Sequence, residues 1–193
     1  MRKERREERT TRKEPRDKRG LPDKYKIQMQ EAPGIQSEMI PGPDRGEKTY
    51  TGHGRLQGRH ALITGGDAGI GRAVALAYAR EGARVAINYL ENESGDAESL
   101  ADLLDEEGLG LVLIPGDIRT REGVTGVVRK ALEALGTLDI LVLNAGVQTA
   151  VSSLEEITEE QLRHTCEVNV FSPLWMVQQA VGEMPAGSSV IFT

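Results

Sequence analysis

The 193-residue sequence has one cysteine, three histidines and few aromatic residues. A single cysteine, Cys166, excludes an internal disulfide and any metal site built from several cysteines, and it is typical of a reducing compartment. The histidines, His53, His60 and His164, lack the spacing of metal ligands, so we expect no bound metal. With two Phe, one Trp and four Tyr, the core must consist of aliphatic side chains and alanine.

Long apolar segments are also missing. No apolar run approaches the roughly 18 residues that a membrane span requires, and no apolar segment follows the charged start as it does in a secretory signal. We therefore expect a cytoplasmic protein that does not enter membranes.

The charge is divided unevenly along the chain. Residues 1–20 contain ten Lys/Arg and five Asp/Glu, whereas the remainder contains 14 basic and 25 acidic residues. The first segment has almost no apolar residue, which predicts a disordered tail. Its acidic residues weaken the positive field, it has no aromatic residue for stacking on bases, and the rest of the chain is acidic, so we expect no nucleic-acid partner.

Residues 21–58 form a second segment that is not globular. Prolines 22, 33, 41 and 43 prevent a long helix or a central strand. The segment carries more apolar side chains than a linker needs, among them Tyr25, Ile27 and Ile35. We expect an extended arm that lies on its own domain or on a partner subunit.

From residue 59 onward the hydrophobic pattern is regular. Short apolar runs at 60–64, 84–89, 110–116, 138–146 and 189–193 predict five strands. Helical spacing over 69–83, 93–108, 120–136 and 158–184 separates them, with a bend expected at Pro173 and with Ile70, Val74, Ala77 and Tyr78 expected on the inward face of the first helix. Alternating strands and helices predict a doubly wound, Rossmann-type α/β domain with a parallel sheet.

The first strand-to-helix turn reads "TGGDAGIG", residues 64–71. Its spacing matches neither the G-x-G-x-x-G fingerprint nor a P-loop. Glycines still permit a positive φ and a close approach of the backbone, and the following helix N-terminus favours an anion. The sequence therefore leaves two interpretations of this turn, a phosphate site and a tight packing turn.

Polar residues follow the other strands at the same edge of the predicted sheet. They are Asn88 and Tyr89, then Gly116, Asp117 and Ile118, and then Asn144, Ala145 and Gly146. Ligands of open α/β sheets bind outside the carboxyl ends of the strands. These residues are expected to surround one crevice together with the glycine turn.

In this combination, "TGGDAGIG", "GDI" and "NAG" resemble the cofactor half of the short-chain dehydrogenase/reductase family. The arm sequence "QEAPGIQSEMIPGPD" is similar to that of bacterial glucose/ribitol-dehydrogenase-like members with a Pro-rich N-terminal extension. The resemblance covers about residues 26–193. It implies a small alcohol or aldehyde substrate, a homo-oligomeric assembly, and a sheet that has seven strands in the complete family fold.

The resemblance also implies roles for individual residues. The pyrophosphate would lie on the backbone of Gly65, Asp67, Gly69, Ile70 and Gly71. Asp117 would accept a hydrogen bond from the adenine amino group, Ile118 would pack on the ring, and Asn144, Ala145 and Gly146 would line the ribose.

The choice between NAD and NADP stays open, with a slight preference for NADP. Many NAD enzymes place an acidic residue at the end of the second strand, where this sequence has Tyr89. Arg72 and Asn88 are expected to accommodate a 2′-phosphate, whereas Glu91 would repel it.

The catalytic residues that the resemblance implies are only partly present. Asn169, in "CEVNVFSP", matches the Asn that supports a water relay, and we predict it as a catalytic residue. The Ser and the Tyr-x-x-x-Lys would follow the last predicted strand, so we expect a C-terminally truncated enzyme. Two alternatives are a non-catalytic nucleotide-binding module and an unstable fragment whose last strand is an exposed edge.

Overall fold

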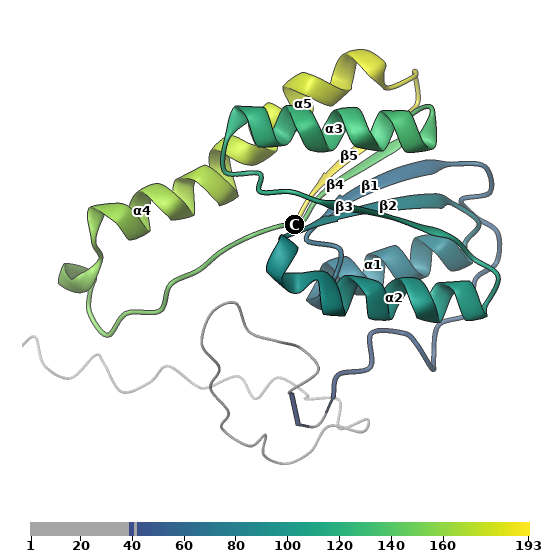
Figure 1. The fold of residues 1–193 in the computed structure, drawn as a ribbon, viewed down its shortest axis with the longest axis horizontal. Helices are drawn as coiled ribbons and strands as arrows, with labels where there is room; N and C mark the ends of the chain where they lie inside the picture. The colour runs from purple at the N-terminus through teal and green to yellow at the C-terminus, as the bar shows by residue number, and fades with distance from the viewer. Residues whose placement is uncertain (1–38, 41) are drawn as a thin grey trace, which may run out of the picture.

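The computed structural model describes residues 39–40 and 42–193, so the predicted tail and the first part of the predicted arm lie outside the described residues. Five strands form one parallel sheet in the order β3-β2-β1-β4-β5 (Figure 1). Their bounds are β1 His60–Thr64, β2 Arg84–Tyr89, β3 Leu111–Pro115, β4 Ile140–Leu143 and β5 Ser189–Phe192. The predicted Rossmann-type arrangement is confirmed, and the strand bounds differ from the prediction by a few residues at most.

Helices cover both faces of the sheet. They are α1 Gly69–Arg80, α2 Ser94–Glu106, α3 Arg121–Leu135, α4 Glu159–Cys166 and α5 Ser172–Ala180, with short 3₁₀ turns at Glu91–Glu93, Leu154–Glu156 and Val181–Glu183. In Figure 1, α1 and α2 lie on one side of the sheet, and α3 and α5 lie on the other. Because both faces are covered, the central strands are apolar at nearly every position.

Two apolar clusters make up the core, one on each face. Ile63 and Ile87 pack with α1 and α2, while Leu62 and Leu141 pack with α3 and α5. Neighbouring residues of one strand thus enter opposite clusters, as the alternation of side chains along a strand requires.

The buried face of α1 differs from the predicted one. Gly71, Arg72, Ala75, Leu76 and Ala79 are buried, whereas Ile70 is 67% exposed and Val74 and Tyr78 are only partly buried. This face is buried because Gly71, in the first turn, approaches the backbone of Gly65 closely. Hydrophobicity alone does not reveal that approach.

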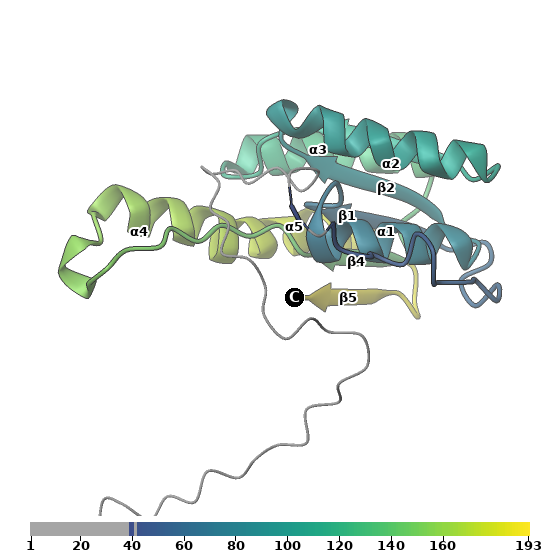
Figure 2. The ribbon, with the colours of Figure 1, turned by 90° about the horizontal axis from the view of Figure 1, so that it is seen from below.

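The last helical region is also arranged differently from the prediction. A π-helical turn over Glu167–Phe171 joins α4 to α5, and Pro173 lies in the first turn of α5. Proline has no N–H, so the carbonyl of Asn169 cannot accept the usual i+4 bond, and a wider turn accommodates this loss. Figures 1 and 2 show α4 projecting beyond the sheet.

Residues 42–58 lie against the C-terminal end of α1. The Arg80 guanidinium donates to the carbonyls of Gly46, Glu47 and Tyr50, at 2.7 to 2.9 Å. The neighbouring Glu81 carboxylate accepts hydrogen bonds from the Tyr50 hydroxyl, from the Arg55 guanidinium and from the backbone N–H groups of His53 and Arg55. Two adjacent charged residues of α1 thus hold this part of the arm.

Candidate functional site at the carboxyl ends of the strands

The strand order reverses between β1 and β4, which places a topological switch point at their carboxyl ends. In open α/β sheets ligands bind in the crevice at this point. The glycine turn follows β1, and Asn144, Ala145 and Gly146 follow β4. The predicted residues of these two segments therefore lie next to each other at the switch point, where a crevice is expected in this fold.

Glycine is required in the turn itself. Gly65 and Gly69 have φ of 60° and 54°, in the left-handed region that disfavours side chains. At Gly71 a Cβ atom would lie 1.9 Å from the carbonyl oxygen of Gly65. The turn is consequently built for close packing of α1 on the end of β1, and its role as a phosphate site stays a prediction.

The N-terminus of α1 faces the same crevice. The first intrahelical hydrogen bond runs from Arg72 N to Ala68 O, 3.0 Å long, and the first turn contains no acidic side chain. N–H groups ahead of that bond, together with the helix dipole, attract an anion. Ile70 in this first turn is 67% exposed.

The two sides of the crevice are braced by Thr64 and Asn144. The Thr64 hydroxyl oxygen accepts hydrogen bonds from the backbone N–H groups of Asn144 and Ala145, both at 3.0 Å. The Asn144 amide donates to the carbonyls of Thr64 and Gly65, at 3.2 and 3.0 Å. Sequence reasoning missed Thr64, although a hydroxyl residue directly before the glycine turn was a usable signal.

Asn169 lies beside the loop that follows β4. Its Oδ1 accepts from Val147 N and its Nδ2 donates to Val147 O, both at 2.8 Å. The π-helical turn that carries Asn169 thus holds the segment next to Gly146. The structure brings Asn169 together with the Asn144–Gly146 side of the crevice.

Asp117 and Ile118 follow β3 at the same edge of the sheet. Asp117 accepts hydrogen bonds from the backbone and guanidinium of Arg119, and these bonds lower the pKa of Asp117. Ile118 is buried in the cluster that includes α3. Its packing on an adenine ring stays a prediction.

Arg72 and Asn88, which were expected to accommodate a 2′-phosphate, have protein partners. Arg72 is 4% exposed and donates to the Asp96 carbonyl at 2.8 Å and to the Glu47 carboxylate at 3.3 Å. The Asn88 amide donates to the carbonyls of Ile114 and Gly116. The prediction that these two side chains contact a 2′-phosphate is wrong, because both are buried and hydrogen-bonded within the protein.

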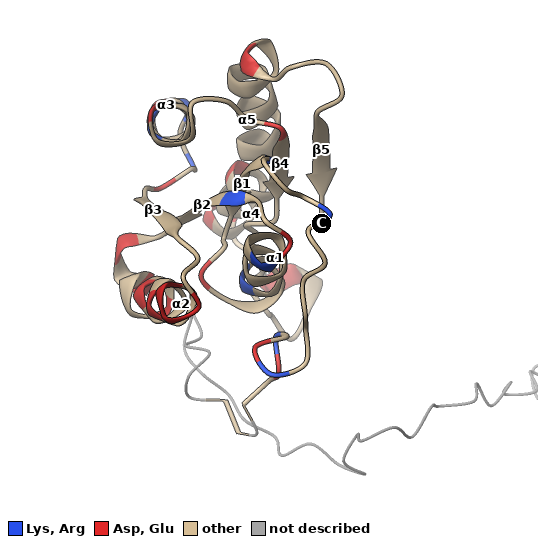
Figure 3. Ribbon diagram, turned by 90° about the vertical axis from the view of Figure 1, so that its right-hand side faces the viewer, with Lys and Arg blue, Asp and Glu red and all other residues tan. Residues whose placement is uncertain are grey.

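Acidic groups gather near the end of β2. Asp67 is 3% exposed; its burial raises the pKa of its carboxyl to about 6, and the carboxylates of Glu93 and Asp96 add to the rise. Tyr89 is buried in the core as well, and burial followed by the charge of Glu91 raises the pKa of its hydroxyl. Figure 3 shows the acidic residues along α2, whose first turn contains Asp96.

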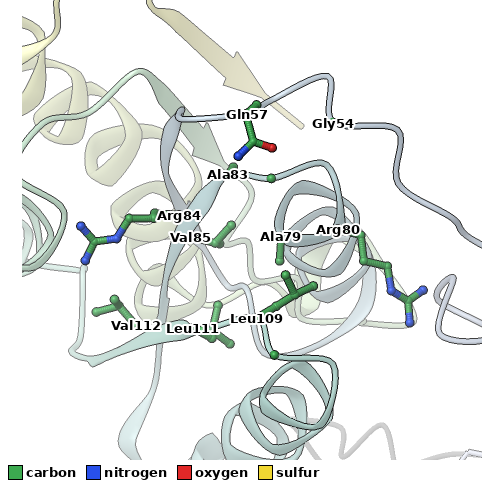
Figure 4. Close-up of a pocket in the computed structure, with 13 residues that line it drawn as sticks. Gly54, Gln57, Ala79, Arg80, Ala83, Arg84, Val85, Leu109, Leu111 and Val112 are labelled. Atoms are coloured by element: carbon green, nitrogen blue, oxygen red, sulfur yellow. The ribbon is translucent and has the colours of Figure 1, made fainter.

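A hollow lies at the opposite, amino-terminal ends of β2 and β3. Leu109, Leu111 and Val85 line it, together with glycines of the neighbouring turns. In Figure 4 the guanidinium groups of Arg80 and Arg84 point away from it. It contains none of the predicted site residues and lies at the end of the strands where ligands of this fold do not bind.

Two further features concern metals and membranes. Among the described residues no three His, Cys, Asp or Glu side chains come together in a way that could hold a metal ion. The helices formed by residues 39–40 and 42–193 include none of the length and apolar character that crossing a membrane demands.

The order of the strands and the glycine turn at the switch point define a Rossmann-type α/β protein. Residues 59–193 match the family model described as short chain dehydrogenase. The chain belongs to this short-chain dehydrogenase family.

Individual relatives agree with that assignment. An uncharacterized oxidoreductase of Bacillus subtilis, YhxD, is 52% identical over 89% of this chain and 57% of its own length. The NADPH-dependent aldehyde reductase 1 of Arabidopsis thaliana is 37% identical over 83% of this chain and 58% of its own length. A short-chain dehydrogenase from Burkholderia cenocepacia, solved with NADP, has a TM-score of 0.68 and 36% identity over 72% of this chain and 56% of its own.

The matched region is a part of each relative. This chain spans somewhat more than half the length of the proteins that it matches. What those proteins bind and convert is therefore a basis for proposals about this chain.

Proposed function

We propose that the crevice binds a nicotinamide dinucleotide and that the protein is an NAD(P)-dependent oxidoreductase. The main supporting observation is the glycine turn before α1, which Thr64 braces to the Asn144 loop. This arrangement offers backbone donors to a pyrophosphate and a hydrogen-bonded wall for a ribose. When bound, the dinucleotide supplies hydride transfer to or from a carbonyl carbon.

The residue roles follow the two sides of the crevice. The backbone of Gly65, Asp67, Gly69, Ile70 and Gly71 would hold the pyrophosphate. The wall for the ribose would be formed by Asn144, Ala145 and Gly146, and the end of β2 at Tyr89 would lie by the adenosine ribose. Asp117 would accept the adenine amino group, and the backbone of Ile118 would complete that pocket.

Asn169 would position a water or substrate group rather than transfer hydride. Both polar atoms of its side chain bond Val147, so its contribution to a relay would come through the position of that loop.

NADP is the preferred cofactor in this proposal. Support comes from the Burkholderia structure, which contains NADP, and from the name of the Arabidopsis reductase. The same name supports an alcohol or aldehyde substrate, and the arm motif supports the glucose/ribitol-dehydrogenase-like branch. The single cysteine supports a cytoplasmic location.

A second candidate function is dinucleotide binding without turnover. The four tyrosines are Tyr25, Tyr50, Tyr78 and Tyr89, and the last lysine is Lys130. Residues 1–193 thus contain no Tyr-x-x-x-Lys after Asn169.

Association with further copies of the chain is part of the proposal. Five large apolar side chains of the helical region over residues 159–183 are exposed: Leu162, Val170, Phe171, Leu174 and Val181. Exposed apolar patches are typical of subunit interfaces. Sedimentation of the purified protein and of Leu174→Glu would test it, with a smaller species expected for the variant.

Titration of the purified protein with NADPH and NADH tests the main proposal, with the fluorescence of Trp175, the only tryptophan, as the signal. Ile70→Glu places a negative charge beside the phosphate turn at an exposed position, and Ile70→Gln is its uncharged control. We expect binding of at least one dinucleotide, weakened about tenfold or more by Glu and little by Gln. Absence of binding by both dinucleotides would refute the proposal. Binding without turnover of aldehydes and alcohols would favour the second candidate.

A further inference from the structure

The arm segment over residues 42–58 contacts α1 near both of the helix ends. Arg80 and Glu81, at the C-terminal end of α1, bond the backbone of this segment. In the first turn of α1, Arg72 Nε donates to the Glu47 carboxylate at 3.3 Å. Figure 2 shows the arm segment passing along the helix that these contacts span.

Arg72 joins the arm segment to α2 and to the glycine turn. It is 4% exposed, and its guanidinium also donates to the Asp96 carbonyl at 2.8 Å and to the Ser99 hydroxyl at 3.4 Å. Its backbone N–H donates to the carbonyl of Ala68, within the turn, at 3.0 Å. Three parts of the protein therefore meet at this one residue.

The Glu47 carboxylate neutralises two guanidinium groups. Its Oε1 lies 2.9 Å from Arg45 Nε and 3.3 Å from Arg72 Nε. Without this carboxylate the two cations would face each other, and the Arg72 cation is buried. An uncompensated buried charge is strongly unfavourable, so the Arg72 side chain would leave its place between α1 and α2, and the first turn of α1 would lose its support.

The position of Glu47 is fixed from the far end of α1. The Arg80 guanidinium donates to the carbonyls of Gly46, Glu47 and Tyr50, at 2.7, 2.9 and 2.8 Å. The backbone on both sides of Glu47 is thus held to the helix. Opening of the arm segment would withdraw the carboxylate from Arg72 together with this backbone.

We propose that the arm segment acts as a strap whose contact from Glu47 to Arg72 couples closure of the arm to the order of the glycine turn. This inference rests on the proposed function, in which the turn binds a dinucleotide. Glu47 is a positioning residue that acts through Arg72. Because coupling between two equilibria is reciprocal, a dinucleotide that binds the ordered turn more tightly must favour the closed arm by the same factor.

Tryptic cleavage after Lys48, an exposed residue of the arm segment, reports its opening, because the protease cuts the transiently opened segment. Mass spectrometry follows the fragment that begins at Thr49, without and with saturating NADPH, or NADH if it binds more tightly. We expect the dinucleotide to slow this cleavage about fivefold in the wild type and little in Glu47→Ala. Titration calorimetry should show about fivefold weaker binding of the dinucleotide by Glu47→Ala.

Two further variants complete the test. Glu47→Gln keeps an oxygen acceptor for Arg72 Nε and should restore most of the affinity and of the protection. Glu106→Ala, an exposed change on α2, is the control and should behave as the wild type in both assays. If Glu47→Ala does not fold, wild-type protein nicked after Lys48 takes its place and should show the same loss of affinity.

The comparison at saturation separates the strap from a general effect of the ligand. A dinucleotide that merely stabilised the whole fold would protect the wild type and Glu47→Ala alike. Equal protection of the two proteins, or equal affinity, would overturn the inference and leave the proposed function standing. Failure of the wild type to bind either dinucleotide would overturn the proposed function as well.

Discussion

Replacing Thr64 with valine should separate the two sides of the crevice. The hydroxyl oxygen accepts two backbone N–H groups, those of Asn144 and Ala145, and valine has nearly the same shape without an acceptor. An unsatisfied buried donor costs about 1 to 3 kcal/mol. Both donors are only partly buried, so water can reach them, and we expect a total loss of about 2 kcal/mol in the free energy of unfolding.

Thr64→Ser is the matched variant, because it keeps the oxygen and removes only a methyl group, at a cost of about 1 kcal/mol. Urea unfolding followed by Trp175 fluorescence gives both free energies, with an unchanged slope indicating an unchanged folded state. Dinucleotide affinity should fall several-fold in Thr64→Val and little in Thr64→Ser. A valine variant as stable as the serine variant, with wild-type affinity, would show that the brace does not hold the crevice.

Three further predictions concern the turn, its acid and the arm. Gly71→Ala should lower the free energy of unfolding by more than about 2 kcal/mol, because its Cβ would lie 1.9 Å from a carbonyl oxygen. Gly126→Ala, which has open space around it in α3, should be neutral or stabilising by up to about 1 kcal/mol in the same urea assay. The folded pKa of Asp67, about 6, exceeds the unfolded value of 3.8, so ionisation of Asp67 destabilises the fold as pH rises. The free energy of unfolding of Asp67→Asn should exceed that of the wild type by about 1 to 2 kcal/mol at about pH 8 and should equal it below about pH 4. An equal difference at both pH values would contradict this prediction. Glu81→Gln should speed tryptic cleavage within residues 42–58, because four groups of this segment donate hydrogen bonds to the Glu81 carboxylate. Glu133→Gln, which changes an exposed ion pair, should leave the cleavage rate unaltered. Equal rates in the wild type and both variants would show that Glu81 does not hold this segment.

The sheet and its crevice were predictable because they depend on short-range patterns. Apolar runs separated by helical spacing fix a parallel sheet, and polar residues after each strand then meet at one edge. The glycine turn followed from the same reasoning, since a positive φ at Gly65 and Gly69 calls for glycine.

Other features depend on contacts that no local pattern contains. Arg72 looks available for a phosphate in the sequence, yet it is buried by residues of α2 and by Glu47, 25 positions upstream. Ile118 likewise looks available to a ring, and the cluster beneath α3 takes it up. The brace at Thr64 joins residues 80 positions apart, so its importance appears only once β1 and β4 are paired.

The π-helical turn at Glu167–Phe171 has a consequence for the phase of the last helical region. One extra residue within a turn rotates everything that follows by about 100° relative to a regular α-helix. Accordingly, α5 buries Ser172, Met176 and Ala180, whereas α4 buries no residue. α5 thus packs on the domain through one face, whereas α4 extends beyond the sheet (Figure 1). Deleting Val170 would remove this rotation between α4 and α5. Either α4 would then no longer keep its present orientation, or Asn169 would no longer hydrogen-bond Val147.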